Sequence, residues 1–554
     1  MRRRTLIATA AALPMLARPS FGQDASRVLR FVPEGNLNNP DPVWTTTTIA
    51  RNHGLMIWDM LFARDDSFTP QPQMVEAWET TPDGLTWSFR LRDGLVFHDG
   101  VPVRGADCIA SIKRWAKRRP LGQTLLERAE EFSAPNDRTF AIRLKKPFGL
   151  MLDAFSDSCF VMPERIAQTD SFTQINEYVG SGPYRFIRDQ WVSGSQAIYL
   201  RNEAYKPRSE APSFMAGGKV AKFDRVEWRI LPDPATAAAA LGNNEVDWIQ
   251  QPQVDLLPLL RRNRNIRVAV NDKIGVVGMI ALNHIHPPFN NPKLRQALLP
   301  ALNQADFVAA VLGDETELFH IPAGTFTPGM PMANDEAMEV FTGPRALERA
   351  RRMVADSGYK NERVVLMAPG DYPHINALAQ VTNDLFKRLG LNVEFAAMDW
   401  GTLVQRRTSK EPVEHGGWSA FCTTYEGLTV ADPSTHVPLR GNGPQGWFGW
   451  PTSPRLEALR EQWLDAPNLD ARKAIARQMQ RIAFEEVPYI PTGQHFNPTA
   501  FRTNVQDIVP ASFPIFWGAR KAWLRMRPAH RRVPGLNARC AGTPCRMAFP
   551  ALRQ

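Results

Sequence analysis

Two aspartates, a histidine and an arginine, side chains able to bind metals or move protons, lie within the stretch "LRDGLVFHDG" at residues 91–100. A metal site draws several ligands from separated elements, but only His98 and Asp99 are adjacent here. Neighbouring strand residues point to opposite faces, so these two side chains cannot bind one ion without a bulge. We therefore interpret the stretch as a hairpin that turns at Asp99 and Gly100.

Two further motifs could carry chemistry, but their surroundings disfavour it. Residues 441–447, "GNGPQGW", have the Gly-x-Gly-x-x-Gly spacing of a phosphate loop, which needs a strand before it and a helix after it. Pro444 and the following "WFGWP" disfavour that helix, so we expect a loop that lets Trp447 and Trp450 pack. The "HIH" at 284–286 could hold a metal, but it precedes two prolines and is a weak signal. No known catalytic motif is present, and we predict no catalytic residue, no bound metal and no cofactor.

The elements around these motifs are predicted from hydrophobic periodicity. Residues 86–92 alternate as a half-buried strand, residues 104–115 have helical spacing, and residues 138–147 form another alternating strand. A helix should begin after Asn291, kink at Pro300 and end at Gly313. Two more helices should be separated by Pro467. Strands alternate with helices through 362–420, which indicates an α/β architecture.

The net charge of +10 does not indicate a nucleic-acid-binding protein. Thirteen of the 66 basic residues lie in the first 18 and the last 35 residues, which contain no acidic residue. The body of the chain is therefore slightly acidic, whereas nucleic-acid binding needs basic residues clustered on the folded surface. A chain of 554 residues is also too long for a single core.

Both ends of the chain differ from the body. Residues 1–22 combine three arginines at positions 2–4 with a short apolar stretch, which predicts an export signal cleaved after about residue 22. The Sec and twin-arginine routes both stay open. No cysteine lies near the cleavage region, so we expect a soluble exported protein without a lipid anchor. Residues 521–554 have no period and are expected to form a disordered basic tail; whether Cys540 and Cys545 pair stays open.

Several stretches together resemble the family 5 extracellular solute-binding proteins, the dipeptide-, oligopeptide- and nickel-binding components of ABC importers. The resemblance covers roughly residues 30–520, and its most specific part runs through the opening motif. The matching stretches are "VEAWETTPDGLTW" at 75–87 with the residues up to Gly100, "GSGPYRF" at 180–186, "FDRVEWRILPD" at 223–233, "NNEVDW" at 243–248, "LNHIHPPFNNPKLRQAL" at 282–298 and "PYIPTG" at 488–493.

This resemblance implies an α/β, two-lobed periplasmic binding protein fold of type II, in its large form with an extra subdomain in the first lobe. The first lobe would span 23–272, with the subdomain at about 50–180, and the chain would return to it at 488–520. The second lobe would span 273–487. In this family the opening motif belongs to the structural subdomain and does not bind ligand.

The resemblance also indicates where a ligand would bind. Three segments should line the space between the lobes: "NNPDPVWT" at 38–45, "APGDYPH" at 368–374 and "GGWSAFCTTYEGLTVADP" at 416–433. Peptide-binding relatives place an ammonium-binding aspartate three residues after a tryptophan in the third segment, and a carboxylate-binding basic residue in the second. This sequence has Phe421 at the first position and no basic residue in the second segment. The expected ligand-binding residues are Trp44, Thr45, Tyr372, Trp418, Phe421, Tyr425 and Asp432.

The function implied is that of a monomeric periplasmic binding component, which captures a solute between its lobes and delivers it to the membrane permease of an ABC importer. The aromatic set suits a peptide-like, uncharged or partly apolar solute. We expect no enzyme activity and no nucleic-acid partner. Two alternatives stay open: a metal or metallophore binder of the nickel type, and a secreted hydrolase.

Overall fold

The computed structural model describes residues 25–45 and 47–522 of the chain. The expected export signal and almost all of the expected tail, with Cys540 and Cys545, lie outside these residues. Lys521 is an exception to the expected tail. It pairs through β21 (Arg520–Lys521) with β20 (Val505–Gln506), and its ammonium lies 2.9 Å from the Asp247 carboxylate. Lys521 therefore belongs to the folded body.

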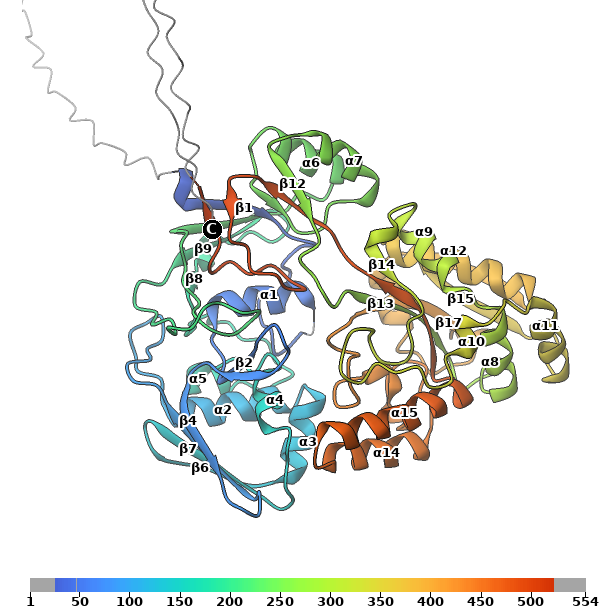
Figure 1. The fold of residues 1–554 in the computed structure, drawn as a ribbon, viewed down its shortest axis with the longest axis horizontal. Helices are drawn as coiled ribbons and strands as arrows, with labels where there is room; N and C mark the ends of the chain where they lie inside the picture. Colours follow the sequence, from blue (N-terminus) through green and yellow to red (C-terminus); the bar gives the residue numbers. More distant parts are fainter. Residues whose placement is uncertain (1–24, 46, 523–554) are drawn as a thin grey trace, which may run out of the picture.

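Two large sheets form the centres of two lobes (Figure 1). In spatial order the first sheet consists of β12 (Ile266–Ala269), β19 (Thr499–Arg502), β11 (Trp248–Ile249), β1 (Val28–Val32), β10 (Arg225–Arg229), β9 (Gln196–Arg201) and β8 (Tyr184–Phe186). The second consists of β14 (Phe319–His320), β18 (Tyr489–His495), β13 (Val276–Leu282), β17 (Ala420–Glu426), β15 (Arg363–Pro369) and β16 (Asn392–Met398).

The chain crosses between these sheets twice, after β12 and after β18. The first crossing lies at 270–275, close to the expected boundary. The second lies at 496–498, whereas the sequence placed it at 488. The difference arises because β18 pairs with β13 along its length, with Ile280 opposite Ile490, so 489–495 belong to the second sheet.

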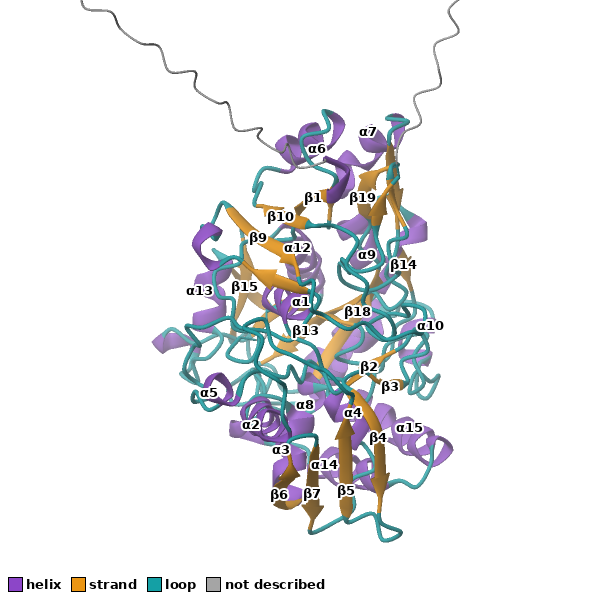
Figure 2. Cartoon of the chain, turned by 90° about the vertical axis from the view of Figure 1, so that its left-hand side faces the viewer, coloured by secondary structure: helices purple, strands orange, loops and turns teal. Residues whose placement is uncertain are grey.

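A smaller antiparallel sheet carries the opening motif. Its order is β4 (Val75–Thr80), β5 (Thr86–Leu91), β7 (Thr139–Leu144) and β6 (Ala129–Asn136), and it occupies one end of the molecule (Figure 2). Phe89, Phe140 and Ile142 are fully buried beneath it, which explains the alternation in the sequence. Its helices are α2 (Gly105–Ala116), α3 (Pro120–Arg128), α4 (Met151–Phe155) and α5 (Glu164–Ala167), and a short hairpin of β2 (Phe62–Arg64) and β3 (Pro70–Pro72) lies nearby in the chain.

Helices of the two lobes begin and end where the sequence indicates. Asn291 caps α8 (Pro292–Leu298) by accepting a hydrogen bond from the Lys293 N–H. The proline at 300 does more than kink the next turn, since a separate helix, α9 (Gln304–Leu312), follows and ends at Gly313. The others are α1 (Thr48–Ile57), α6 (Pro234–Gly242), α7 (Leu257–Arg262), α10 (Glu339–Thr342), α11 (Leu347–Asp356), α12 (Pro373–Arg388), α13 (Trp400–Arg406), α14 (Pro454–Asp465) and α15 (Leu469–Glu486).

The lobes also touch far from the crossings, where α3 of the subdomain lies beside α14 (Figure 1). The Asp465 carboxylate on α14 lies 3.0 Å from the Arg128 guanidinium and 2.6 Å from the Lys146 ammonium. This ion-pair cluster joins the two lobes on the side of the molecule opposite the crossings. No helix in the described part of the chain is long and apolar enough to span a membrane.

Candidate functional site

Parallel strands in both sheets end beside residues able to bind a ligand. In the first sheet β11, β1 and β10 run parallel, and Glu34 follows the end of β1. In the second sheet β16, β15 and β17 run parallel, so Tyr372, Trp400 and Glu426 lie just after or at their carboxyl ends. Ligands of α/β proteins bind outside the carboxyl ends of such strands. These two edges are therefore the candidate site.

An ion pair joins the two edges. The guanidinium of Arg51, on α1 of the first lobe, pairs with the Glu426 carboxylate at the end of β17. The same guanidinium lies 4.3 Å from the centre of the Phe513 ring. Because both partners of the pair are largely shielded from solvent, the two carboxyl edges meet directly at this point.

Glu34 faces the space beside this ion pair. Its carboxylate accepts hydrogen bonds from the Thr48 hydroxyl and, at 3.2 Å, from the Gln251 side-chain amide. The side chain is accessible to solvent, yet desolvation by surrounding protein raises its pKa, and the negative charge of Glu426 adds to this rise. We call the region between the two carboxyl edges, beside the Arg51–Glu426 ion pair, the recess.

Tyr372 reaches the same recess from the second lobe. It precedes α12, is 44% exposed, and its ring lies 5.5 Å from that of Trp400. Desolvation raises the pKa of its hydroxyl, and the charge of Glu34 raises it further. The pKa of Tyr372 therefore responds to a charge on the opposite lobe, and its ligand-binding role stays a prediction.

Arg407 is a cation surrounded by aromatic rings. The guanidinium carbon lies 4.4 Å from the centre of the Phe448 ring, 5.8 Å from Trp400 and 5.9 Å from Phe421. No carboxylate in the described part of the chain forms an ion pair with it, and its buried Nε has no hydrogen-bond acceptor. Desolvation lowers its pKa. An uncompensated guanidinium in such a setting is suited to bind an anionic group.

Tyr425 lies between this cation and a tryptophan. Its half-buried ring is 5.8 Å from that of Trp447, and desolvation raises the pKa of its hydroxyl to about 12, with the charge of Arg407 acting in the opposite direction. Trp447, at the end of the loop at 441–447, therefore packs within the aromatic cluster. This agrees with our interpretation of residues 441–447 as a loop that lets Trp447 pack.

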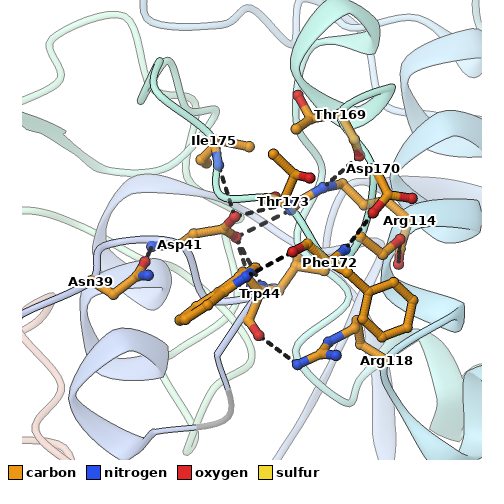
Figure 3. A network of polar contacts seen from close by, with 12 residues as sticks. Asn39, Asp41, Trp44, Arg114, Arg118, Thr169, Asp170, Phe172, Thr173 and Ile175 are labelled. Atoms are coloured by element: carbon orange, nitrogen blue, oxygen red, sulfur yellow. Dashed lines mark hydrogen bonds and ion pairs between the residues drawn. The ribbon is translucent and has the colours of Figure 1, made fainter.

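The loop that carries Trp44 and Thr45 is fixed from within the first lobe (Figure 3). Asp41 forms a fully buried ion pair of 2.7 Å with Arg114 and accepts backbone hydrogen bonds from Val43, Trp44 and Ile175. The Trp44 indole N–H donates to the Phe172 carbonyl at 3.0 Å. Because the indole N–H is already hydrogen-bonded within the first lobe, Trp44 can contact a ligand only through the face of its ring.

Trp418 and Phe421 require a correction. Both side chains are fully buried, their ring centres are 5.1 Å apart, and the Trp418 N–H donates to the Arg407 carbonyl. Buried rings offer no face to a ligand in this structure. The Trp418 indole instead supports the backbone of Arg407, so we expect its removal to destabilise the fold.

Asp432, the carboxylate expected to bind ligand, is engaged locally. It accepts hydrogen bonds from the Ser434 N–H and hydroxyl, which makes it a turn residue. Other charged groups of the second lobe are also engaged. Asp371 accepts the Trp400 N–H at 2.7 Å, Glu426 pairs with Arg51, and Arg440 pairs with Glu457.

The opening motif is structural. Phe97 and Val101 close the hairpin by a backbone hydrogen bond, and the two ring nitrogens of His98 contact the Gly180 N–H and the Gly182 carbonyl. His98 therefore joins the hairpin to "GSGPYRF". In the "HIH" motif both histidines contact backbone carbonyls, and no group of three metal-binding side chains exists among the described residues.

A separate hollow of about 570 Å³ opens at the rim of the molecule. Phe68 of the first lobe and Met330 and Met332 of the second line it. None of the residues at the carboxyl edges contributes to it, so it does not replace them as the candidate site.

Sequence reasoning missed Glu34, Arg51 and Arg407. In the stretch "VLRFVPEG" an acidic residue, Glu34, directly follows a strand that reads as buried, and this position could have suggested a ligand-binding carboxylate. Arg407 follows Trp400 by seven residues, two helical turns, and that spacing could have suggested an aromatic-flanked cation. Nothing in the sequence alone indicated that Arg51 would meet Glu426, 375 residues away.

The comparisons with known proteins agree with this architecture. The chain is 39% identical over 516 residues to the "Probable peptide ABC transporter periplasmic-binding protein y4tO" of Sinorhizobium fredii, covering 93% of this chain and 97% of that relative. Two solved structures share the fold at a TM-score of 0.74 and 19% identity, each covering 89% of this chain. They are DppA from Helicobacter pylori with the peptide STSA, covered over 98% of its length, and a dipeptide-binding protein from Pseudoalteromonas sp. SM9913 with Met-Leu, covered over 100%.

The family model for "Bacterial extracellular solute-binding proteins, family 5 Middle" matches residues 69–434, well over half of the chain. That match includes the hairpin motif, the subdomain and most of the second lobe. With two lobes, two crossings and a candidate ligand recess between facing carboxyl edges, the chain belongs to the family 5 bacterial extracellular solute-binding proteins.

Proposed function

We propose that the protein is the periplasmic substrate-binding component of an ABC importer, and that it binds a peptide-like solute between its lobes and presents it to the permease. The observation that carries this proposal is the meeting of two carboxyl edges from opposite lobes through Arg51 and Glu426. Lobe closure around a solute excludes water and creates a surface that the permease can distinguish from the open form.

The chemistry of the recess supports a peptide-like solute that carries a carboxylate. Arg407 is the uncompensated cation, and the neighbouring rings exclude water and strengthen its attraction for an anion. Tyr372 and Tyr425 supply apolar faces with polar tips, as in most small-molecule sites. The 368–374 segment contains no arginine or lysine to pair with a ligand carboxylate; we propose that Arg407, the residue directly after α13, takes this role.

Identification of the retained solute tests the proposal. The exported protein is purified gently from its host without refolding, the solute is released by unfolding, and it is identified by mass spectrometry. We expect short peptides or amino-acid derivatives that carry a carboxylate. Recovery of a metal complex, or of a neutral sugar, would contradict the proposal.

Substitution of Arg407 gives a second test. Calorimetric titration with synthetic peptides of two to five residues is expected to show at least about thirtyfold weaker binding for Arg407→Gln, because a buried charge would lose its partner. The matched control is Arg349→Gln on α11, an exposed arginine without an ion pair in the described structure. Amidation of the peptide carboxylate should weaken binding to the natural protein but not to Arg407→Gln.

A further inference from the structure

On the first-lobe side of the recess, the Glu34 carboxylate forms no ion pair with any residue that the structure describes. Glu34 has two hydrogen-bond donors, the Thr48 hydroxyl and the Gln251 amide, and both are neutral. Among the described residues no lysine, arginine or histidine lies within ion-pair distance of its carboxylate. Arg51 is the nearest cation that acts on it, and that guanidinium is already paired with Glu426.

The position of Glu34 is held firmly. Its backbone N–H donates to the Gln250 side chain at 3.1 Å, and Gln250 directly follows β11, the strand beside β1. The Thr48 hydroxyl that binds its carboxylate lies at the start of α1. A carboxylate positioned by two neighbouring strands and a helix loses little side-chain entropy when it binds a partner.

The groups around Glu34 are suited to bind an ammonium group. Tyr372, from the other lobe, is exposed after the carboxyl end of β15, and the charge of Glu34 raises the pKa of its hydroxyl. Glu426 adds negative charge from the second lobe. Glu34, Glu426 and Arg51 together carry one net negative charge, which a single ammonium group with three N–H donors would neutralise.

Resting on the proposed function, we propose that Glu34 binds the amino group of the solute, so that the ligand class is an α-ammonium compound such as a peptide with a free amino end. This assignment moves the amino-end anchor to the first lobe, away from position 421, where a buried phenylalanine stands. The ammonium also contacts Glu426 and Tyr372 of the second lobe when the lobes close. Ligand binding and closure are thereby linked through one charge.

Paired ligands and variants test this assignment directly. Synthetic peptides of two to five residues with free ends are titrated calorimetrically beside their desamino analogues, in which hydrogen replaces the amino group. The natural protein should bind the free peptides about 10- to 100-fold more tightly, the range for a hydrogen bond to a charged group. Glu34→Gln should lose that preference and should bind the desamino analogues unchanged.

The controls separate the possible failures. Glu348→Gln, which changes an exposed glutamate on α11, should retain the full preference, and thermal unfolding should show that Glu34→Gln remains folded. A Glu34→Gln protein that still prefers free amino ends overturns the assignment and leaves the proposed function standing. If the natural protein binds none of the peptides, the peptide-binding proposal itself fails.

Discussion

Asp41 is expected to be among the most sensitive positions of the chain, because its carboxylate is buried within the first lobe. Its ion pair with Arg114 is fully buried, and the two carboxylate oxygens also hold the backbone of the loop at 39–45 (Figure 3). Substitution by alanine leaves a buried guanidinium without its counter-charge, which costs about 3–5 kcal/mol of unfolding free energy.

An exposed pair of similar length supplies the control. Asp99 and Arg165 lie 3.0 Å apart at the hairpin surface, where solvent screens the charges, so Asp99→Ala should cost no more than about 1 kcal/mol. Urea unfolding followed by circular dichroism measures both variants against the natural protein. Because Asp41 also fixes Trp44, its substitution should weaken ligand binding as well. Equal losses of stability for the two variants would refute the argument that burial sets the cost.

The double variant sharpens the same test. Replacement of Asp41 and Arg114 together by leucine and methionine removes both buried charges, and the unfolding free energy should recover part of the loss seen for Asp41→Ala. Full recovery is not expected, because the backbone donors of Val43, Trp44 and Ile175 lose their acceptor. A double variant less stable than Asp41→Ala would mean that packing, and not the unpaired charge, dominates.

Three further outcomes are expected. Trp418→Ala should lower the unfolding free energy, measured by urea unfolding, by about 3–5 kcal/mol, because it leaves a cavity at a fully buried position. A loss below about 1 kcal/mol would instead favour the original expectation that Trp418 contacts the ligand. Asp465→Asn should weaken ligand binding two- to tenfold in calorimetry, because it removes the ion pairs that close the lobes, and high salt should reduce the difference. The unfolding free energy should fall as pH is lowered from about 6.5 towards 4. Burial lowers the histidine pKa in the folded protein to about 4 for His98 and about 3 for four others, so over this range the unfolded chain binds more protons than the folded one. An unfolding free energy that does not change over that range would contradict this prediction. The other four are His53, His284, His436 and His495.

Local patterns in the sequence predicted local structure well. The alternation at 86–92, the Asn291 cap and the break at Pro467 depend on residues close together in the chain, and each has its counterpart in β5, α8 and the boundary between α14 and α15. The hairpin expected at 91–100 contains only a single bridge, between Val96 and Pro102, because the turn follows too soon for a longer ladder.

The site was harder to predict because it depends on contacts between distant segments. The place of Tyr372 after a strand is visible in the sequence, and the structure leaves its side chain 44% exposed there; its ligand-binding role stays a prediction. Trp418 was assigned to the ligand because an aromatic side chain suits both a core and a stacking surface, and only packing decides between them. Glu34 and Arg407 have no ion-pair partner among residues 25–45 and 47–522, and no sequence pattern reports that a partner is missing.

The order of strands has a consequence for how the protein matures. β18 lies between β14 and β13 in one sheet, and β19 lies between β12 and β11 in the other, yet both come from residues 489–502. Domains usually fold in the order of their synthesis, but here each large sheet lacks one of its interior strands until residues 489–502 have been synthesised. The two lobes should therefore mature together as one late event. A product that stops before residue 489 would present unpaired strand edges in both halves, and such edges promote aggregation and recognition by proteases.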